Sequence, residues 1–167
     1  MCIRDSFQRI TRGQNVVGGE LWQSSGPTVI VECNPLPIKT RAKVFHEGID
    51  LHVPSIRRIP PECLSPSVKS HNYLNLVLAD LEVRDKGLNA WAILLDTRGF
   101  LCEGIGCNLF LVRNGCLLTP RSQYVLAGVS RQTVIELAEK LGIPVIEDDL
   151  LPYDVLNADE AFKTSYG

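Results

Sequence analysis

The chain has 167 residues, enough for one ordinary domain, and 45% of them are hydrophobic, enough to fill a core of that size. Acidic and basic residues are mixed along the sequence and give a formal net charge of -2, which argues against a nucleic-acid partner. No signal-peptide core is present, and no apolar run reaches the ~18 residues of a membrane helix. These features predict a cytoplasmic globular protein with no membrane partner.

The cysteines and histidines suggest neither disulfides nor a metal site. None of the six cysteines lies in a C-x-x-C pair, and the three histidines are scattered away from them. We therefore expect reduced, mostly buried thiols and no bound metal.

The first 66 residues are rich in turn-forming residues. Segments 7–13 and 27–33 have the composition of β-strands, and a Gly- and Ser-rich loop separates them. A proline-rich link follows at 34–39, and a second proline-rich connector at 54–66 is expected to be extended because proline disfavours helix.

A helix is predicted within residues 71–87, where apolar residues recur at helical spacing and Gly87 follows at the expected stop. Apolar segments after it are expected to form strands, and Asn114-Gly115 between two of them is a strong hairpin signal. A second helix is predicted over 130–141, with Ser130 as its N-cap and Gly142 at its end. The expected strands are 90–96, 100–104, 107–113, 116–120, 143–148 and 160–165. Together they predict a mixed sheet with interspersed helices.

Glu103 taken alone is an ordinary strand-end carboxylate, which is usually a solvated surface group. The residues that follow it form a longer pattern, and this pattern resembles the signature of the class IV (fold type IV) pyridoxal-phosphate aminotransferases. The matching residues are Glu103, Asn108, Phe110, Leu117, Thr119, Val125, Gly128, Val129, Ser130 and Arg131.

The resemblance extends on both sides, over residues 7–166. Upstream, SVKSHNYLNLVLADLEVRDKG is similar to the segment around the family's Schiff-base lysine, which makes Lys69 the candidate. The implied fold class is α/β (α+β) mixed: a fold type IV large domain at 44–167, built on a mixed pseudo-barrel sheet with flanking helices. Residues 1–43 would be a remnant of the small N-terminal domain and its linker. We expect a fragment truncated at both ends, with residues 1–6 and Tyr166 not native.

The resemblance also implies roles for individual residues and pyridoxal 5'-phosphate (PLP) as cofactor. Lys69 would be the catalytic residue, because PLP chemistry needs a lysine amine that binds the cofactor and shuttles the Cα proton. Glu103 would face the pyridine nitrogen and keep it protonated. At the start of the second helix, the N–H groups of Val129 and Ser130 would bind the phosphate.

Asn108 is a further cofactor-binding candidate, and two other residue types are ambiguous. Tyr73 matches a tyrosine that branched-chain members place near the cofactor's phenolic oxygen, but on a helix it is equally a core aromatic. Arg57 and Arg58 are interpreted as linker or surface charges, because the family's phosphate-binding arginine lies well ahead of the lysine.

The implied activity is transamination of an amino acid, with a slight preference for a branched-chain amino acid and 2-oxoglutarate because of VKSHNYLN. Alternatives are an aminodeoxychorismate lyase and an (R)-amine or D-amino-acid transaminase, although the Arg-x-His carboxylate trap of the D-amino-acid enzymes has no counterpart. An inactive fragment or a non-catalytic domain is the alternative of another class. The family also implies a homodimer.

Overall fold

The computed structural model describes residues 4–15, 17–87 and 90–165. Packing separates the chain into two compact units. We call residues up to Gly48 the hairpin unit and residues from Ile49 onward the sheet unit. The predicted domain boundary after residue 43 stays a prediction, and the change in packing falls a few residues later.

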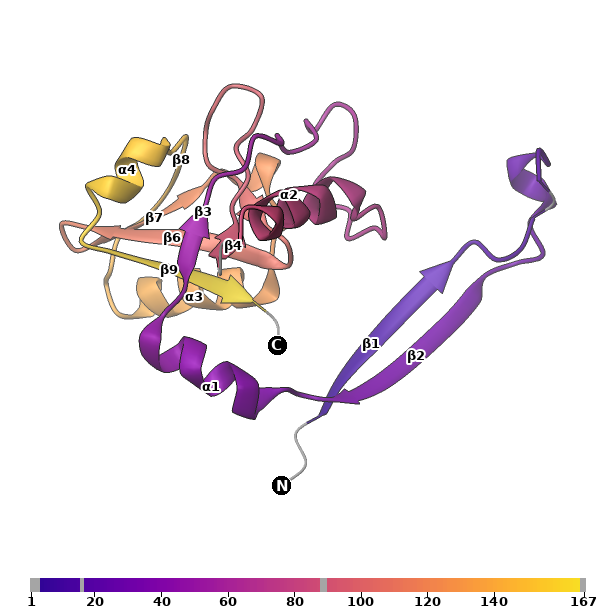
Figure 1. Ribbon diagram of the computed structural model, residues 1–167, viewed down its shortest axis with the longest axis horizontal. Helices are drawn as coiled ribbons and strands as arrows, with labels where there is room; N and C mark the ends of the chain where they lie inside the picture. The colour runs from indigo at the N-terminus through magenta and orange to yellow at the C-terminus, as the bar shows by residue number, and fades with distance from the viewer. Residues whose placement is uncertain (1–3, 16, 88–89, 166–167) are drawn as a thin grey trace. The chain divides into compact units, whose positions relative to one another are not determined.

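The hairpin unit consists of two long antiparallel strands and a helix (Figure 1). Strand β1 (Arg4–Thr11) pairs along its whole length with β2 (Thr28–Pro35), and the loop between them contains a short 3-10 helix, η1 (Leu21–Gln23). Helix α1 (Ile38–Glu47) is not among the predicted elements. The prolines of the preceding link suggest irregular chain, yet proline is tolerated immediately before a helix because the first N–H groups need no helical acceptor.

The sheet unit carries the remaining elements (Figure 1). In chain order they are β3 (Asp50–His52), α2 (Leu74–Asp85), β4 (Ala90–Ala92), β5 (Glu103–Gly104), β6 (Cys107–Arg113), β7 (Cys116–Pro120), η2 (Ser122–Tyr124), α3 (Val129–Lys140), β8 (Val145–Asp148), α4 (Pro152–Leu156) and β9 (Glu160–Ser165).

Strand β6 is the centre of a five-stranded mixed sheet. It pairs antiparallel with β5, β7 and β9, while β7 pairs parallel with β8. Strands β3 and β4 form a separate parallel pair. A mixed α/β fold is therefore confirmed, but the described strands form open sheets and not the closed pseudo-barrel that was expected.

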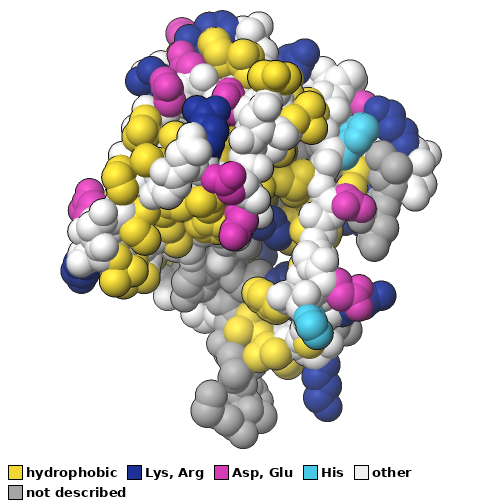
Figure 2. Space-filling model, turned by 90° about the vertical axis from the view of Figure 1, so that its left-hand side faces the viewer, with side chains coloured by type: hydrophobic (Ala, Val, Ile, Leu, Met, Phe, Trp, Pro, Cys, Tyr) yellow, Lys and Arg dark blue, Asp and Glu magenta, His cyan; other side chains and the backbone are white. Residues whose placement is uncertain are grey.

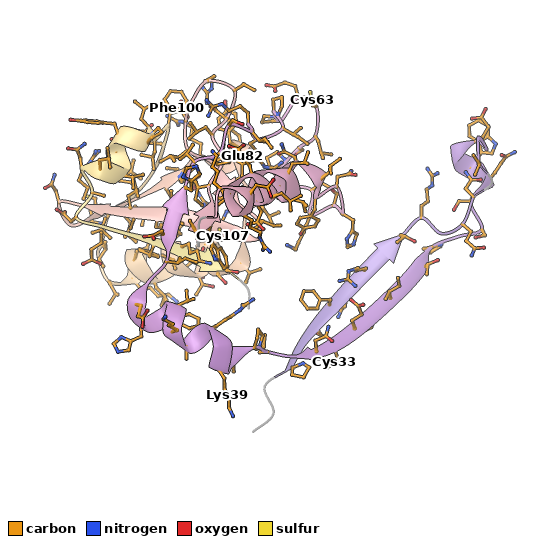
Figure 3. All side chains as sticks on the ribbon, viewed as in Figure 1. Cys33, Lys39, Cys63, Glu82, Phe100 and Cys107 are labelled. Atoms are coloured by element: carbon orange, nitrogen blue, oxygen red, sulfur yellow. The ribbon has the colours of Figure 1, made fainter. Side chains whose placement is uncertain are left out.

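The two faces of β6 have different environments. Cys107, labelled in Figure 3, belongs with Leu109 and Leu111 to one buried cluster. Phe110, on the opposite face, stacks on Phe162 of β9 with 5.1 Å between ring centroids. A second buried cluster lies between α2 and β4 and contains Leu76, Ala79, Val83, Ala92 and Leu94.

Several predicted elements are confirmed within a residue or two. Strands 107–113, 116–120 and 160–165 have the predicted bounds, and the hairpin turn at Asn114 and Gly115 has positive φ at both positions (51° and 74°). The N-cap prediction was wrong: Gly128 caps α3, which begins at Val129, and Ser130 lies inside the first turn. Strands 90–96 and 100–104 are shorter than expected, because only isolated bridges join Leu95 to its neighbours.

Five cysteines lie within the described residues and all are free, while Cys2 lies outside them. Cys102 and Cys107 are buried and Cys116 is half-buried, but Cys33 and Cys63 are exposed. The reduced state agrees with the prediction, and burial holds for only part of the set.

Hydrophobic side chains also remain on the surface of the sheet unit, and Figure 2 shows such side chains, in yellow, gathered over one face. Exposed examples on α3, β8 and α4 are Leu137, Ile146 and Leu156. Within the described part of the chain, no helix is long and apolar enough to cross a membrane.

Candidate functional site

Glu103 is the centre of the site. It lies on β5, and only 5% of its surface is exposed. Its Oε1 accepts hydrogen bonds from Arg58 Nε (3.1 Å) and Nη2 (3.0 Å), and its Oε2 accepts one from the Leu126 N–H (2.9 Å). Burial raises the pKa of this carboxyl above its usual value, although the Leu126 N–H and Arg58 oppose the shift. The carboxylate is thus buried and held in one orientation.

Arg58 corrects the sequence interpretation. It is not a linker or surface charge, because its side chain is only 11% exposed and pairs with Glu103. Its main-chain N–H donates to the Leu95 carbonyl (2.8 Å), which fixes the connector against the strand pair. Arg57 is exposed, as expected. The available signal was weak: a buried carboxylate needs a cation, but the sequence does not say which arginine supplies it.

Lys69 lies in the loop before α2, and its side chain is exposed. Its positive charge lowers the pKa of Glu103, so the ammonium group is within electrostatic reach of the buried carboxylate. The fold therefore brings together the lysine and the acid that the sequence singled out from separate segments. Their roles toward a cofactor stay predictions.

Asn108 joins the sheet to the turn that begins α3. Its side chain is buried, and Nδ2 donates to the Leu126 carbonyl (2.9 Å). A Cβ on Gly128 would clash with Asn108 Oδ1, so only glycine fits there. Leu126, through its N–H to Glu103 and its carbonyl to Asn108, thereby links the acid to the helix start.

The N-terminus of α3 suits an anion. Gly128 provides no side-chain cap, and the first N–H groups of any helix have no acceptor within it. The Val129 side chain is exposed, and the half-buried Ser130 hydroxyl makes only a long hydrogen bond (3.4 Å) to the Ser165 carbonyl. These groups fit a phosphate, which helix N-termini bind through N–H donors and the helix dipole.

A buried hydroxyl on the neighbouring strand also fits a ligand. Thr164 of β9 lies opposite Asn108, and Asn108 lies opposite Glu103, so the three form one row across the sheet. Thr164 Oγ1 is buried and has no hydrogen-bond partner. Buried polar atoms are normally paired, so an unpaired hydroxyl in this row is consistent with a bound polar group. Sequence reasoning did not single out Thr164.

Tyr73 immediately precedes α2 and is half-buried. It packs against the cluster between α2 and β4. This environment matches the interpretation of the tyrosine as a core aromatic, and the contact with a cofactor oxygen stays a prediction. No group of three or more His, Cys, Asp or Glu residues in the described ranges could hold a metal ion.

Comparison with known proteins assigns the family. The family model described as amino-transferase class IV matches residues 9–165. The chain belongs to the class IV aminotransferases. Among relatives of this family, a Methanocaldococcus jannaschii protein provisionally named a branched-chain-amino-acid aminotransferase is 40% identical over 165 residues, which is 97% of this chain and 56% of the relative.

Solved class IV structures agree with this assignment. The Escherichia coli branched-chain amino acid aminotransferase has a TM-score of 0.78 and 35% identity, and the match covers 84% of this chain and 46% of that one. The branched-chain enzyme from T.th., complexed with N-(5'-phosphopyridoxyl)-L-glutamate, has a TM-score of 0.74 and 30% identity, with 87% and 45% coverage. The chain spans about half the length of the relatives it matches.

Proposed function

We propose that this chain is the PLP-binding part of an aminotransferase that transfers the amino group of a branched-chain amino acid to 2-oxoglutarate. The observation that carries the proposal is the meeting of Lys69 with the buried, oriented Glu103. The family assignment and the names of the relatives support it, as does the phosphopyridoxyl compound in one of the solved branched-chain enzymes.

Lys69 has the central role in the proposed reaction. Bound PLP supplies an electron sink that makes the substrate Cα proton acidic. Lys69 Nζ binds the cofactor, leaves when the amino donor arrives, and then acts as the general base that takes the Cα proton and returns it. Exposure of Lys69 leaves its amine accessible to both partners.

The other residues bind and orient. Glu103 holds a proton on the ring nitrogen through a charge-assisted hydrogen bond, and its two fixed contacts prevent the carboxylate from turning away. The N–H groups of Val129 and Ser130 bind the phosphate at the start of α3. Asn108 keeps that helix start at a fixed distance from Glu103 through Leu126.

The first experiment is an absorbance titration of the purified chain with PLP. The proposal expects a visible band that disappears in Lys69→Ala and persists in Lys86→Ala, a lysine at the other end of α2 that instead pairs with Glu82. A band that survives Lys69→Ala would mean that another lysine binds the cofactor. If the wild-type chain and a full-length relative both give no band, the PLP proposal is wrong.

The substrate is tested on the loaded protein. Addition of leucine should convert the band and release the corresponding 2-oxo acid, and 2-oxoglutarate should restore the band. Release of pyruvate from aminodeoxychorismate without amino transfer would instead support the lyase. Dimer formation and a cytoplasmic location stay predictions of the sequence.

A further inference from the structure

Asn75 makes an unusual set of contacts for a residue in the first turn of a helix. It lies on α2, and its side-chain Nδ2 donates to the Arg57 carbonyl (2.8 Å). Its Oδ1 accepts from the Ile59 N–H (3.2 Å) and, at the long distance of 3.5 Å, from Arg58 Nη1. One amide group thus contacts three consecutive residues of the connector.

These contacts bear on Arg58 because the connector has little other regular structure. Apart from the Arg58 N–H to Leu95 bond and an isolated bridge at Arg57, the described connector is irregular. Each net hydrogen bond contributes about 1 kcal/mol, so the Asn75 amide is a substantial part of what holds residues 57–59. The guanidinium that it orients ends on Glu103 Oε1.

We infer that Asn75 is a positioning residue of the active site, which clamps the connector so that Arg58 stays against Glu103. The inference rests on the proposed function for its catalytic meaning, while the clamp itself is a property of the protein without cofactor. Since α2 also follows the Lys69 loop, the clamp ties the lysine-bearing segment and the arginine that partners the acid to one helix.

The charge of Glu103 is the quantity that the clamp controls. The charged and titratable groups near this carboxyl are Arg58 and Lys69, which lower its pKa, and the thiols of Cys102 and Cys107, whose own pKa values Glu103 raises. Burial raises the pKa of Cys102 to about 12 and also raises that of Cys107, so both thiols are neutral at physiological pH. Loss of the Arg58 contact therefore raises the pKa of Glu103 without compensation from the thiols.

The test measures the Glu103 carboxyl by carbon-detected NMR in the full 167-residue chain without PLP. Asn75→Ala is expected to raise the Glu103 pKa, and Arg58→Met to raise it further. In the Arg58→Met background, Asn75→Ala is expected to add nothing, because its effect passes through Arg58. Hydrogen exchange at the Ile59 N–H should accelerate by about fivefold in Asn75→Ala, which corresponds to a lost bond of about 1 kcal/mol.

Ser55→Ala is the matched control. Ser55 Oγ donates to Glu82 Oε2 (2.7 Å), which joins the same connector to the same helix without touching Arg58. Figure 3 labels Glu82 on α2. This variant should leave the Glu103 pKa unchanged. If Asn75→Ala does not fold, Asn75→Asp keeps the size and the acceptor oxygen, and the part of its shift that vanishes with Arg58→Met measures the same coupling.

The inference is overturned if Asn75→Ala leaves the Glu103 pKa unchanged while Arg58→Met raises it, or if Ser55→Ala raises it equally. The outcome is separable from that of the proposed function. A pKa response without a Lys69-dependent PLP band would support the clamp and overturn the aminotransferase chemistry. A band without a pKa response would leave that chemistry standing and overturn the clamp alone.

Discussion

The hairpin unit and the sheet unit contain strands of similar length that are stabilised in different ways. Both β2 and β6 pair with a neighbour along most of their residues, but most side chains of β2 are exposed and those of β6 are mainly buried. Val31 of β2 is 66% exposed, whereas Phe110 of β6 is fully buried. Backbone pairing alone fixes the register of a strand, but burial supplies most of its free energy. Only the buried strand can hold a carboxylate in one orientation.

The largest expected effect is the loss of Phe110. Phe110→Ala should lower the free energy of unfolding of the sheet unit by about 3–5 kcal/mol, because it removes a fully buried ring and its stacking on Phe162. Urea unfolding followed by circular dichroism measures this loss. Val31→Ala in the hairpin unit is the control and should change stability by no more than about 0.5 kcal/mol. Equal losses in the two variants would contradict the comparison.

The next effect concerns the buried ion pair. Arg58→Met should cost about 3 kcal/mol at neutral pH, because Glu103 is left without its cation. The folded pKa of Glu103 already lies above its unfolded value, so its burial favours stability below the unfolded pKa and costs stability as pH rises through the folded pKa. The variant moves the folded pKa further up, which enlarges the cost.

Unfolding free energies of wild type and Arg58→Met measured across the range from about pH 4 to pH 8 test the sign of this linkage. The difference between them should be smallest at the acid end, where Glu103 is neutral in both states, and should grow as pH rises. A difference that is constant over this range would mean that Arg58 contributes packing rather than charge compensation.

A smaller effect is expected where the sheet meets the start of α3. Gly128→Ala places a methyl group against Asn108 Oδ1 and should displace the side chain that bonds the Leu126 carbonyl. We expect a loss of about 1–3 kcal/mol in thermal unfolding, together with weaker PLP binding. Asn108→Ala makes room for the methyl group, so Gly128→Ala should cost less in that background. An undiminished cost would show that Gly128 is required for another reason.

The smallest effect is expected in the hairpin unit. Arg9 and Glu32 form an ion pair across β1 and β2, and both side chains are more than one-third exposed. Arg9→Ala should change the stability of the hairpin unit by about 0–1 kcal/mol, because exposed pairs gain little over hydration. Hydrogen exchange of the β2 amides measures it at low and high salt. A loss comparable to that of Phe110→Ala would mean that this pair, and not burial, stabilises the hairpin.

Local signals predicted much of the sheet unit. The apolar segments 107–113 and 116–120, joined by Asn114-Gly115, predict strand bounds that the fold reproduces, since a two-residue turn with positive φ favours pairing of the adjacent segments. Gly142 has φ of 71° just after α3, as predicted for a helix end. Helix α1 was missed because the prolines before it imitate a loop signal, and α4 because five residues carry too little periodicity.

The sequence by itself determined which residue types were available and where local elements begin, because turns, hairpins and helix ends depend on neighbouring residues. Tertiary structure alone decided that Arg58 and not Arg57 reaches Glu103, that Asn75 clamps the connector, and that Thr164 joins the row of Asn108. These choices depend on burial and on distances between segments far apart in the chain. The charge of a buried carboxylate is set by such contacts, because low dielectric strengthens the effect of every nearby charge, and no local pattern records them.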